Sequence, residues 1–265
     1  MKSVKESMTR DLSKFGIESS VTEPCTECNY KYAVRVVITK TDGTVTSYCK
    51  YCEDQRLVES LNIPKSKDDR LLQKMRGKAK YFSRIPEDVK DAKLNDYKAV
   101  TDTQKKAKNQ AVDFVTQFDK KKSLILSGDP GIGKTHIAVA IANALAKENS
   151  VLFLKSTNLL DLIKESYSND SYSEMDVMEL CRDVDLLVID DLGAEYSKPG
   201  DSESWASDII YKAIDSRLDK SLIITTNYSE SLLEQKYGFN GKRITSRMSD
   251  NATKIRMVGT DMRRE

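Results

Sequence analysis

One octapeptide constrains what this chain can fold into more than any other feature of its sequence. Residues 128–135 read GDPGIGKT, a complete G-x-x-x-x-G-K-T pattern. An apolar run at 124–126 precedes it, and a helix-forming segment at 136–147 follows it. Glycines let successive backbone N–H groups turn towards one point, and the N-terminus of the following helix adds its dipole there. The pattern therefore predicts a strand, a phosphate-binding loop and a helix in succession.

The chemistry of phosphate binding gives these residues separate expected roles. Lys134 is expected to neutralise the β- and γ-phosphates of ATP, and the Thr135 hydroxyl is expected to hold Mg²⁺. A glycine-rich turn without a ligand is the alternative interpretation, and the flanking strand and helix argue against it. The other residues expected to contact the nucleotide are Gly128, Asp129, Pro130, Gly131, Ile132, Gly133 and His136.

Short, almost wholly apolar runs recur after this loop, separated by helical patterns. They lie at 151–154, 186–189 and 222–224. Such runs are typical of parallel strands that helices cover on both faces. The predicted fold class is therefore α/β, a three-layer, doubly wound parallel sheet that carries the phosphate-binding loop. We expect this domain to span residues 85–265.

Polar side chains follow two of these runs. Asp190 is expected to order the Mg²⁺ shell, and Asp191, one residue on, to polarise the attacking water. Asn227 ends the run LIITTN and is expected to orient that water. Each could instead be only a turn residue. Open α/β sheets bind their ligands at the carboxyl ends of the strands, which favours the functional interpretation for all three.

Four of the five cysteines form two close pairs. Cys25 and Cys28 are separated by 20 residues from Cys49 and Cys52, a spacing typical of a zinc ribbon. Four thiolates would close a tetrahedron around zinc and leave no position for a catalytic water, so the predicted site is structural. Two disulfides, or four unrelated cysteines, are the alternatives. A module of about thirty residues buries too little apolar surface to fold unaided, so we expect metal to decide whether it folds.

Between the two cysteine pairs, Asp42-Gly43 separates two β-rich runs and predicts a type I′ hairpin turn. We expect a zinc-binding domain at 1–60 and a basic helical connector at 61–84. From Pro64 to Ile85 there are eight basic residues and two acidic ones. The net charge of the whole chain is only +2, so any contact with nucleic acid must be local.

The N-terminal residues contain no apolar segment of signal-peptide length, and the chain has no run of 18 apolar residues. We therefore expect a cytoplasmic protein without a membrane partner. Paired cysteines in such a reducing compartment favour metal ligation over disulfides, and the remaining Cys181 is expected to be a small core residue.

Four motifs, in this order, carry a resemblance to a known family. The segments GDPGIGKTHIAVAIANAL, LLVIDDLGAE, IITTN and KRITSRM resemble the DnaC/DnaI family of helicase loaders, within the IstB-like AAA+ group. The resemblance covers about residues 85–265 and implies an ATPase of the AAA+ type. It implies that Arg247 is an arginine finger reaching the ATP site of the next subunit. It also implies that Arg263 is a sensor-2 arginine contacting the γ-phosphate of its own subunit, with Arg264 as the alternative position.

The same resemblance implies partners. They are a DnaB-type replicative helicase, single-stranded DNA and further copies of the chain that associate through the AAA+ domain, while the zinc region grips the helicase. Two other functions stay open. An IstB-like transposition helper would bind duplex DNA and a transposase, and an ATP-gated adaptor would bind the helicase and only block it.

Overall fold

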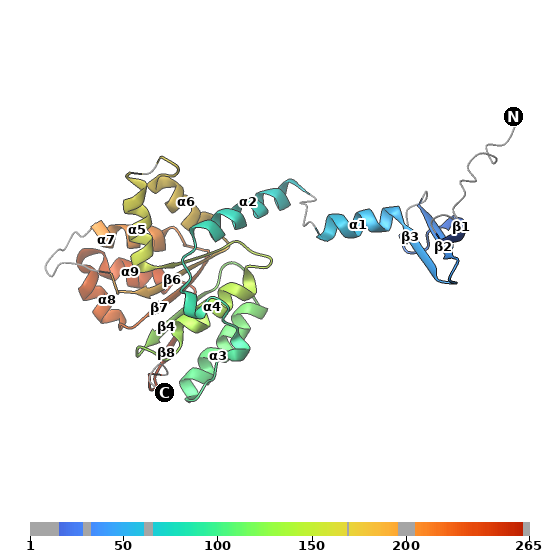
Figure 1. Ribbon diagram of the computed structural model, residues 1–265. Coiled ribbons are helices and arrows are strands. Elements are labelled where there is room, and N and C mark those ends of the chain that lie inside the picture. Colours follow the sequence, from blue (N-terminus) through green and yellow to red (C-terminus); the bar gives the residue numbers. More distant parts are fainter. Residues whose placement is uncertain (1–15, 29–32, 61–65, 169, 196–204, 262–265) are drawn as a thin grey trace. The chain divides into compact units, whose positions relative to one another are not determined.

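The computed structural model describes residues 16–28, 33–60, 66–168, 170–195 and 205–261. The chain divides into two compact units, 1–65 and 66–265 (Figure 1). The phosphate-binding motif belongs to the second unit, and the paired cysteines belong to the first. Arg263 and Arg264, for which the resemblance implies a sensor-2 role, lie outside the described residues.

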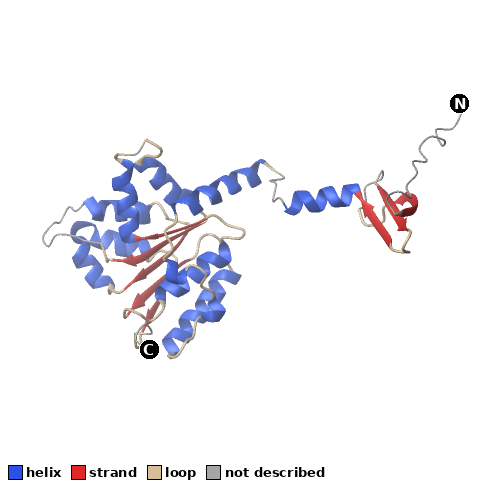
Figure 2. Cartoon of the chain, viewed as in Figure 1, coloured by secondary structure: helices blue, strands red, loops and turns tan. Residues whose placement is uncertain are grey.

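The second unit is built on a five-stranded parallel sheet with the strand order β5-β6-β7-β4-β8. Helices flank this sheet on both sides (Figure 2). The predicted three-layer α/β fold is therefore confirmed. Its strands are β4 (Ser123–Gly128), β5 (Val151–Lys155), β6 (Leu186–Leu192), β7 (Ser221–Thr226) and β8 (Ala252–Met257).

Alternate residues along each strand pack into opposite layers, because successive side chains of a strand point to opposite faces. In β6, Leu187 and Ile189 join one buried cluster, whereas Leu186 and Val188 join the other. Helices α3 (Asp102–Thr116) and α4 (Lys134–Leu145) complete one layer. The opposite layer contains α5 (Ser156–Ser166), α6 (Glu174–Asp183), α7 (Trp205–Asp215), α8 (Glu230–Tyr237) and α9 (Gly241–Met248).

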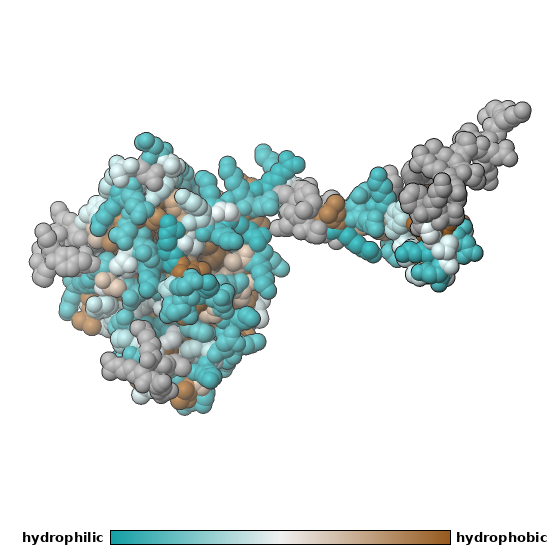
Figure 3. All heavy atoms as spheres, in the orientation of Figure 1, coloured by the Kyte–Doolittle hydropathy of each residue, from teal (hydrophilic) through white to brown (hydrophobic). Residues whose placement is uncertain are grey.

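Helix α2 (Lys67–Phe82) belongs to the second unit and packs against its core. Its residues Ala79 and Phe82 are buried in the same cluster as α5 and α6. After the helix, the Ser83 hydroxyl accepts a hydrogen bond from the backbone N–H of Phe153, and the Arg84 N–H donates to the Phe153 carbonyl at 2.8 Å. The chain thereby covers the outer edge of β5. The basic segment expected as a connector thus contains a helix with one buried side, and its visible side is hydrophilic (Figure 3).

The first unit contains a three-stranded antiparallel sheet, β1 (Ile17–Pro24), β2 (Val34–Lys40) and β3 (Val45–Cys49), followed by α1 (Lys50–Ser60). The hairpin between β2 and β3 forms where Asp42-Gly43 predicts it, but its turn type differs. Of that pair only Gly43 has a positive φ, and its N–H donates to the Lys40 carbonyl. The turn is therefore a type I turn followed by a left-handed glycine, because a type I′ turn needs two positive φ angles.

Short 3₁₀ helices at Glu87–Val89, Leu94–Asp96 and Gly238–Asn240 complete the described regular structure. Among the described helices, none combines the length and the apolar character needed to span a membrane.

Candidate functional site

The loop between β4 and α4 has a backbone that only glycine fits at two positions. Gly128 has φ 135° and Gly133 has φ 90°, both in the region that side chains disfavour. A Cβ atom on Gly128 would lie 1.9 Å from the carbonyl oxygen of Met257. On Gly133 it would lie 2.3 Å from the ring of Tyr97. The loop is therefore fixed between β8 on one side and the segment before α3 on the other.

Lys134 begins helix α4 and is 7% exposed. Its Nζ atom donates to the carbonyl oxygens of Gly128 at 2.9 Å and of Asp129 at 2.6 Å. The ammonium group is thus held inside the curled loop. This is the place where the motif predicts that it meets the phosphates of a nucleotide.

Asp190 lies at the end of β6 and is fully buried. One carboxylate oxygen, Oδ1, accepts hydrogen bonds from the hydroxyls of Thr135 at 2.9 Å and Thr225 at 2.6 Å. The other, Oδ2, is buried and has no hydrogen-bond partner among the described residues. Burial raises the pKa of Asp190, although the hydrogen bonds from Thr225 and Thr135 act in the opposite direction.

An unpartnered buried carboxylate oxygen is costly, and a bound cation would satisfy it. Carboxylate and hydroxyl oxygens are the ligands that Mg²⁺ prefers in proteins. Asp190 and Thr135 therefore fit the role of magnesium ligands that the sequence predicts for them.

Asp191 turns away from the direction of the strand. Its φ is 56°, a left-handed conformation that costs a residue other than glycine about 1–3 kcal/mol. Its N–H donates to the Thr225 hydroxyl at 2.8 Å, and its Oδ1 accepts from the Asn227 amide at 3.0 Å. The two strand ends thereby hold the Asp191 carboxylate against the Asn227 amide. Strained backbone of this kind is common at functional sites.

These side chains line one cleft of about 440 Å³. Gly131, Gly133, Lys134, Thr135, His136, both aspartates and Asn227 all line it, so the structure brings these predicted residues together. Of the other residues predicted to contact the nucleotide, Gly128 and Asp129 line a second cavity, and Pro130 and Ile132 line neither. His136 also places its Nε2 atom 3.3 Å from the Lys93 carbonyl oxygen. The described lining residues are Pro86, Asp88, Val89, Asp96, Tyr97, Lys98, Gly131, Gly133, Lys134, Thr135, His136, Lys155, Asp190, Asp191, Thr225 and Asn227.

Half of the described lining residues were not predicted from the sequence, and three of these lie next to predicted site residues. Thr225 bonds to both aspartates, and its place in the run LIITTN, two residues before Asn227, was a signal that could have found it. Lys155 ends β5 and pairs in register with Asp190. The Tyr97 hydroxyl donates to the Ile132 carbonyl at 2.7 Å, and burial raises the pKa of Tyr97 to about 12. Lys155 and Tyr97 belong to no sequence motif.

Arg247, the predicted finger, lies on α9 and does not line this cleft. Its Nε atom donates to the Asp215 carboxylate at 2.8 Å, and its side chain is 44% exposed. The structure therefore separates Arg247 from the nucleotide cleft of its own chain.

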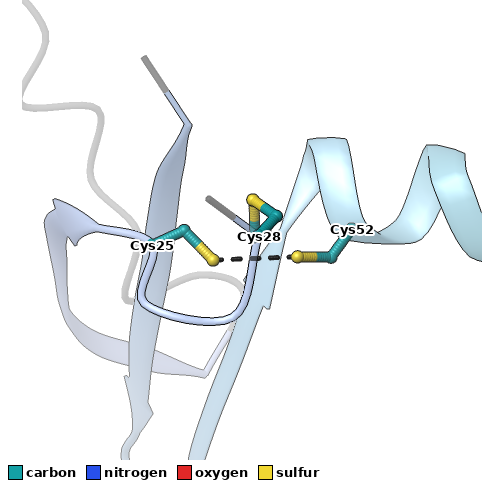
Figure 4. Close-up of side chains that lie close together, drawn as sticks. Cys25, Cys28 and Cys52 are labelled. Atoms are coloured by element: carbon teal, nitrogen blue, oxygen red, sulfur yellow. Dashed lines mark hydrogen bonds between the residues drawn. The ribbon is translucent and has the colours of Figure 1, made fainter. Parts of the chain in front are cut away.

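The first unit gathers its four paired cysteines at one point. Their sulfur atoms all lie within 4.8 Å of one another, with Cys25 and Cys52 at 3.7 Å and Cys28 and Cys49 at 3.8 Å. Figure 4 shows three of these side chains, from the loop after β1 and from α1, converging. A zinc ion with Zn–S bonds of about 2.3 Å would need sulfur–sulfur edges of about 3.8 Å. The arrangement fits a structural zinc site.

Backbone N–H groups also favour metal binding here. Hydrogen bonds from the backbone N–H groups of Cys28 and Glu27 lower the pKa of Cys25, whereas burial and the neighbouring thiols raise the pKa of Cys52. The thiolate is the form that ligates zinc, and these bonds stabilise it. None of these four cysteines is joined in a disulfide in the described structure.

The fold and the cleft together define a P-loop nucleotide-binding protein of the AAA+ type. A glycine-rich loop follows β4, an amide follows the neighbouring strand β7, and two acids lie on β6, the strand beyond β7. All of these groups line one cleft. Comparison with known proteins then gives the family. The chain belongs to the IstB-like ATP-binding protein family, which it matches over residues 32–264.

Individual relatives agree with the resemblance to helicase loaders. The chain is 31% identical over 157 residues to the replicative helicase loader DnaC of Escherichia coli strain K12. It is 28% identical over 165 residues to an ATP-binding protein of insertion sequence IS232 from Bacillus thuringiensis. These matches span 58% and 59% of this chain and 62% of each relative's length. The crystal structure of DnaI superposes with a TM-score of 0.55 and 27% identity, covering 66% of this chain and 93% of that chain.

Proposed function

We propose that this protein is an ATP-dependent loader of a DnaB-type replicative helicase onto single-stranded DNA. One observation carries the ATPase part of the proposal. Lys134, Thr135 and Asp190 meet in the cleft where Asn227 orders Asp191, which is the set of groups that binding and hydrolysis of ATP require. The similarity to DnaC, a replicative helicase loader, supports the partner and the task.

In the proposed reaction, the loop binds the phosphates of ATP and Lys134 neutralises their charge. When bound, Mg²⁺ would be held by Thr135 and Asp190 and would withdraw charge from the β- and γ-phosphate oxygens. Asp191 accepts the proton of the attacking water, and the Asn227 amide holds its carboxylate in place. Thr225, on the neighbouring strand, bonds to both aspartates, so the base Asp191 and the metal ligand Asp190 are held at a fixed position relative to each other.

Completion of this site requires a second copy of the chain. A cation facing the γ-phosphate stabilises the negative charge that spreads over its oxygens in the transition state. Arg247 lies outside the cleft of its own chain, so we assign it as a finger acting on a neighbour's ATP, with Arg263 as the sensor in cis. ATP hydrolysis then depends on self-association through the AAA+ domain, and it drives release of the helicase.

The first unit is proposed to hold the helicase. When bound, zinc would link the four thiolates and fix the sheet β1–β3 to α1. The sheet would then present a fixed surface to the helicase. We place the protein in the cytoplasm, where single-stranded DNA and the helicase meet.

A second candidate function is help to a transposase. The family assignment and the 28% identity to the IS232 protein favour it. Both functions use the same ATP cleft, so the partner and the form of DNA distinguish them. A transposition helper would bind duplex DNA and a transposase in place of single-stranded DNA and a helicase.

Co-purification with a DnaB-type helicase, with and without ATP, tests the proposal. Wild-type protein should retain the helicase in an ATP-dependent way and hydrolyse ATP. Lys134→Ala should lose nucleotide binding, whereas Lys147→Ala, which alters an exposed lysine at the end of the same helical segment, should behave as wild type. Capture of a transposase, together with preference for duplex DNA, would replace the first proposal by the second.

A further inference from the structure

Among the residues that the structure describes, Asp215 is the one hydrogen-bond partner of the Arg247 guanidinium, and it contacts a single edge of that group. Its Nε–H donates to Oδ1 of Asp215 at 2.8 Å. Arg247 lies in the last turn of α9, and Asp215 is the last residue of α7. Both side chains are partly exposed, at 44% and 36%. The contact therefore joins the ends of two packed helices at the surface of the second unit.

Asp215 is itself oriented by a neighbour one helical turn earlier. The Tyr211 hydroxyl donates to the same Oδ1 atom at 3.1 Å. That hydroxyl accepts a hydrogen bond from Nη2 of Arg243 at 2.8 Å, and the Arg243 guanidinium lies 4.1 Å from the centre of the Tyr211 ring. Arg243, Tyr211, Asp215 and Arg247 thus form a continuous series of donors and acceptors, which we call the α7–α9 network.

The geometry leaves the reactive end of Arg247 available. A guanidinium carries N–H groups on Nε and on both terminal nitrogens, and phosphate oxygens are bound by pairs of them. Asp215 takes the Nε–H, so the two terminal Nη groups can face a phosphate. An arginine already fixed along its length loses less rotational freedom when it binds. The network therefore orders the side chain and leaves its phosphate-binding groups unblocked.

The recipient is the cleft of another copy. The described residues that line the nucleotide cleft come from β5, β6, the end of β7 with the residue after it, the loop before α4, the start of α4 and the segment 86–98. None of them belongs to α7 or α9. We propose that Asp215 and Tyr211 are positioning residues that hold Arg247 for entry into the ATP site of a second copy of this chain. This inference rests on the proposed function, in which Arg247 acts in trans.

Fold stability does not account for the network. An exposed ion pair contributes little to the stability of a fold, because solvent screens it and two side chains must be ordered. Substitution of Asp215 should therefore leave folding and the chain's own ATP binding unchanged. Any loss of turnover can then be assigned to the delivery of Arg247.

The first test compares single and double variants in steady-state ATP hydrolysis under conditions where the chains associate. Arg247→Ala should reduce kcat by about 10³-fold or more. Asp215→Ala should reduce kcat by about 10- to 100-fold, the effect of a misplaced catalytic group, with unchanged affinity for ATP. Asp215→Asn keeps an oxygen acceptor for Nε and should recover most of the rate. The double variant Asp215→Ala/Arg247→Ala should be no slower than Arg247→Ala alone.

Two further variants serve as controls, one inside the α7–α9 network and one outside it. Tyr211→Phe removes only the hydroxyl that orients Asp215, and it should lower kcat by a few-fold. Asp102→Ala removes an exposed carboxylate that pairs with Lys105 outside the network, and it should leave kcat unchanged.

The second test mixes Asp215→Ala with Lys134→Ala, with association of the mixture checked by sedimentation. The first variant supplies an intact ATP cleft, and the second supplies an intact network, so the mixture should regain activity. No recovery would mean that Asp215→Ala damages its own cleft, and the inference would be wrong. Asp215→Ala with wild-type turnover, beside an inactive Arg247→Ala, would also overturn it and leave the proposed function standing. Higher turnover in Asp215→Ala would show that Asp215 restrains the arginine. Full activity of Arg247→Ala would instead remove the trans finger itself.

Discussion

The two units of the chain differ in what holds each fold together. In the second unit, two buried apolar clusters lie on opposite faces of a parallel sheet. In the described part of the first unit, the only buried hydrophobic residues are Ala33 and Cys49. Each fully buried Leu or Ile contributes about 1.5–3 kcal/mol, so the second unit has a large apolar driving force and the first has almost none. We therefore expect the stability of the first unit to depend on zinc bound by its four thiolates.

This contrast also separates the chemistry. The second unit fixes its site with rigid strands, so the strained backbone of Asp191 can be maintained by the surrounding core. In the described part of the first unit, no comparable core surrounds the cysteines, and a closed metal site with four thiolates is suited to structure and not to catalysis. Changes to one site should therefore leave the other intact.

Loss of zinc should produce the largest effect and should be confined to the first unit. A structural zinc site contributes on the order of 10 kcal/mol, so chelation or Cys49→Ser should unfold residues 16–60. Metal analysis and circular dichroism would follow this, while calorimetry should show an unchanged transition for the second unit.

Cys181→Ala is the matched cysteine control. Cys181 is fully buried in the second unit. Its replacement should retain zinc and lower the stability of the second unit by about 1 kcal/mol. If the first unit kept its fold after complete removal of zinc, its stability would not depend on metal, and the proposed difference between the two units would be wrong.

Asp191→Asn should have the next largest effect. The change keeps the size of the side chain and removes the base, so kcat for ATP hydrolysis should fall by about 10²–10⁴-fold with ATP binding retained. Asp161→Asn, at an exposed position on α5, is the control and should keep full activity. Normal turnover in Asp191→Asn would transfer the role of the base to Asp190. Zinc content should be the same in all of these variants.

Mg²⁺ affinity should depend on pH through Asp190. Burial raises the pKa of this carboxyl, so protons compete for it at a higher pH than the ordinary value of about 3.9. Affinity for Mg²⁺ in the presence of ATP should therefore be highest well above the raised pKa of Asp190, where the carboxyl is ionised. It should fall as the pH drops through that pKa. Isothermal titration at several pH values measures this.

Thr225→Val sharpens the same prediction. It removes a hydrogen bond that favours the Asp190 carboxylate, so the loss of Mg²⁺ affinity should move to higher pH. If Thr225→Val folds and its Mg²⁺ affinity has the same pH dependence as wild type, Asp190 is not a magnesium ligand.

The parts of the fold predicted from sequence are those with a strong apolar signal. The runs in β4 to β7 are buried on both faces and therefore read as parallel strands. Strand β8 was missed because only Ile255 and Met257 of its residues are buried, and Lys254 and Arg256 interrupt the pattern. Strand β1 was missed because almost all of it is exposed. In both, pairing with a neighbouring strand decides the structure, and pairing leaves little local signal.

The candidate site follows the same division. Residues at the carboxyl ends of parallel strands converge at one edge of the sheet, so Asp190 and Asn227 could be placed together from their positions alone. Tyr97 reaches the loop from a segment with no regular pattern, and its contact with Ile132 depends on the packing of the whole unit. The partnership of Arg247 with Asp215 depends on how α7 and α9 pack, which no motif records.

The smallest predicted effect compares the two units directly. Ile223→Val removes one buried methylene from β7, the central strand of the sheet. It should lower the free energy of unfolding of the second unit by about 0.5–1.5 kcal/mol. Val45→Thr changes a residue of β3 that is 61% exposed, so it should change the free energy of unfolding of the first unit by no more than about 0.5 kcal/mol. Denaturant unfolding of the zinc-bound protein, followed separately for each unit, measures both. Equal costs would show that the first unit has an apolar core after all.

Loading of a helicase onto a closed circle of single-stranded DNA is the direct test of the proposed loader function. A circle has no ends, so a helicase ring can reach it only if the ring opens. Wild-type protein with ATP should place DnaB-type rings on the circles, counted after gel filtration, whereas Lys134→Ala and Cys49→Ser should place almost none. Equal loading with and without the protein, or equal loading by Lys134→Ala, would contradict the claim that this chain is an ATP-dependent helicase loader.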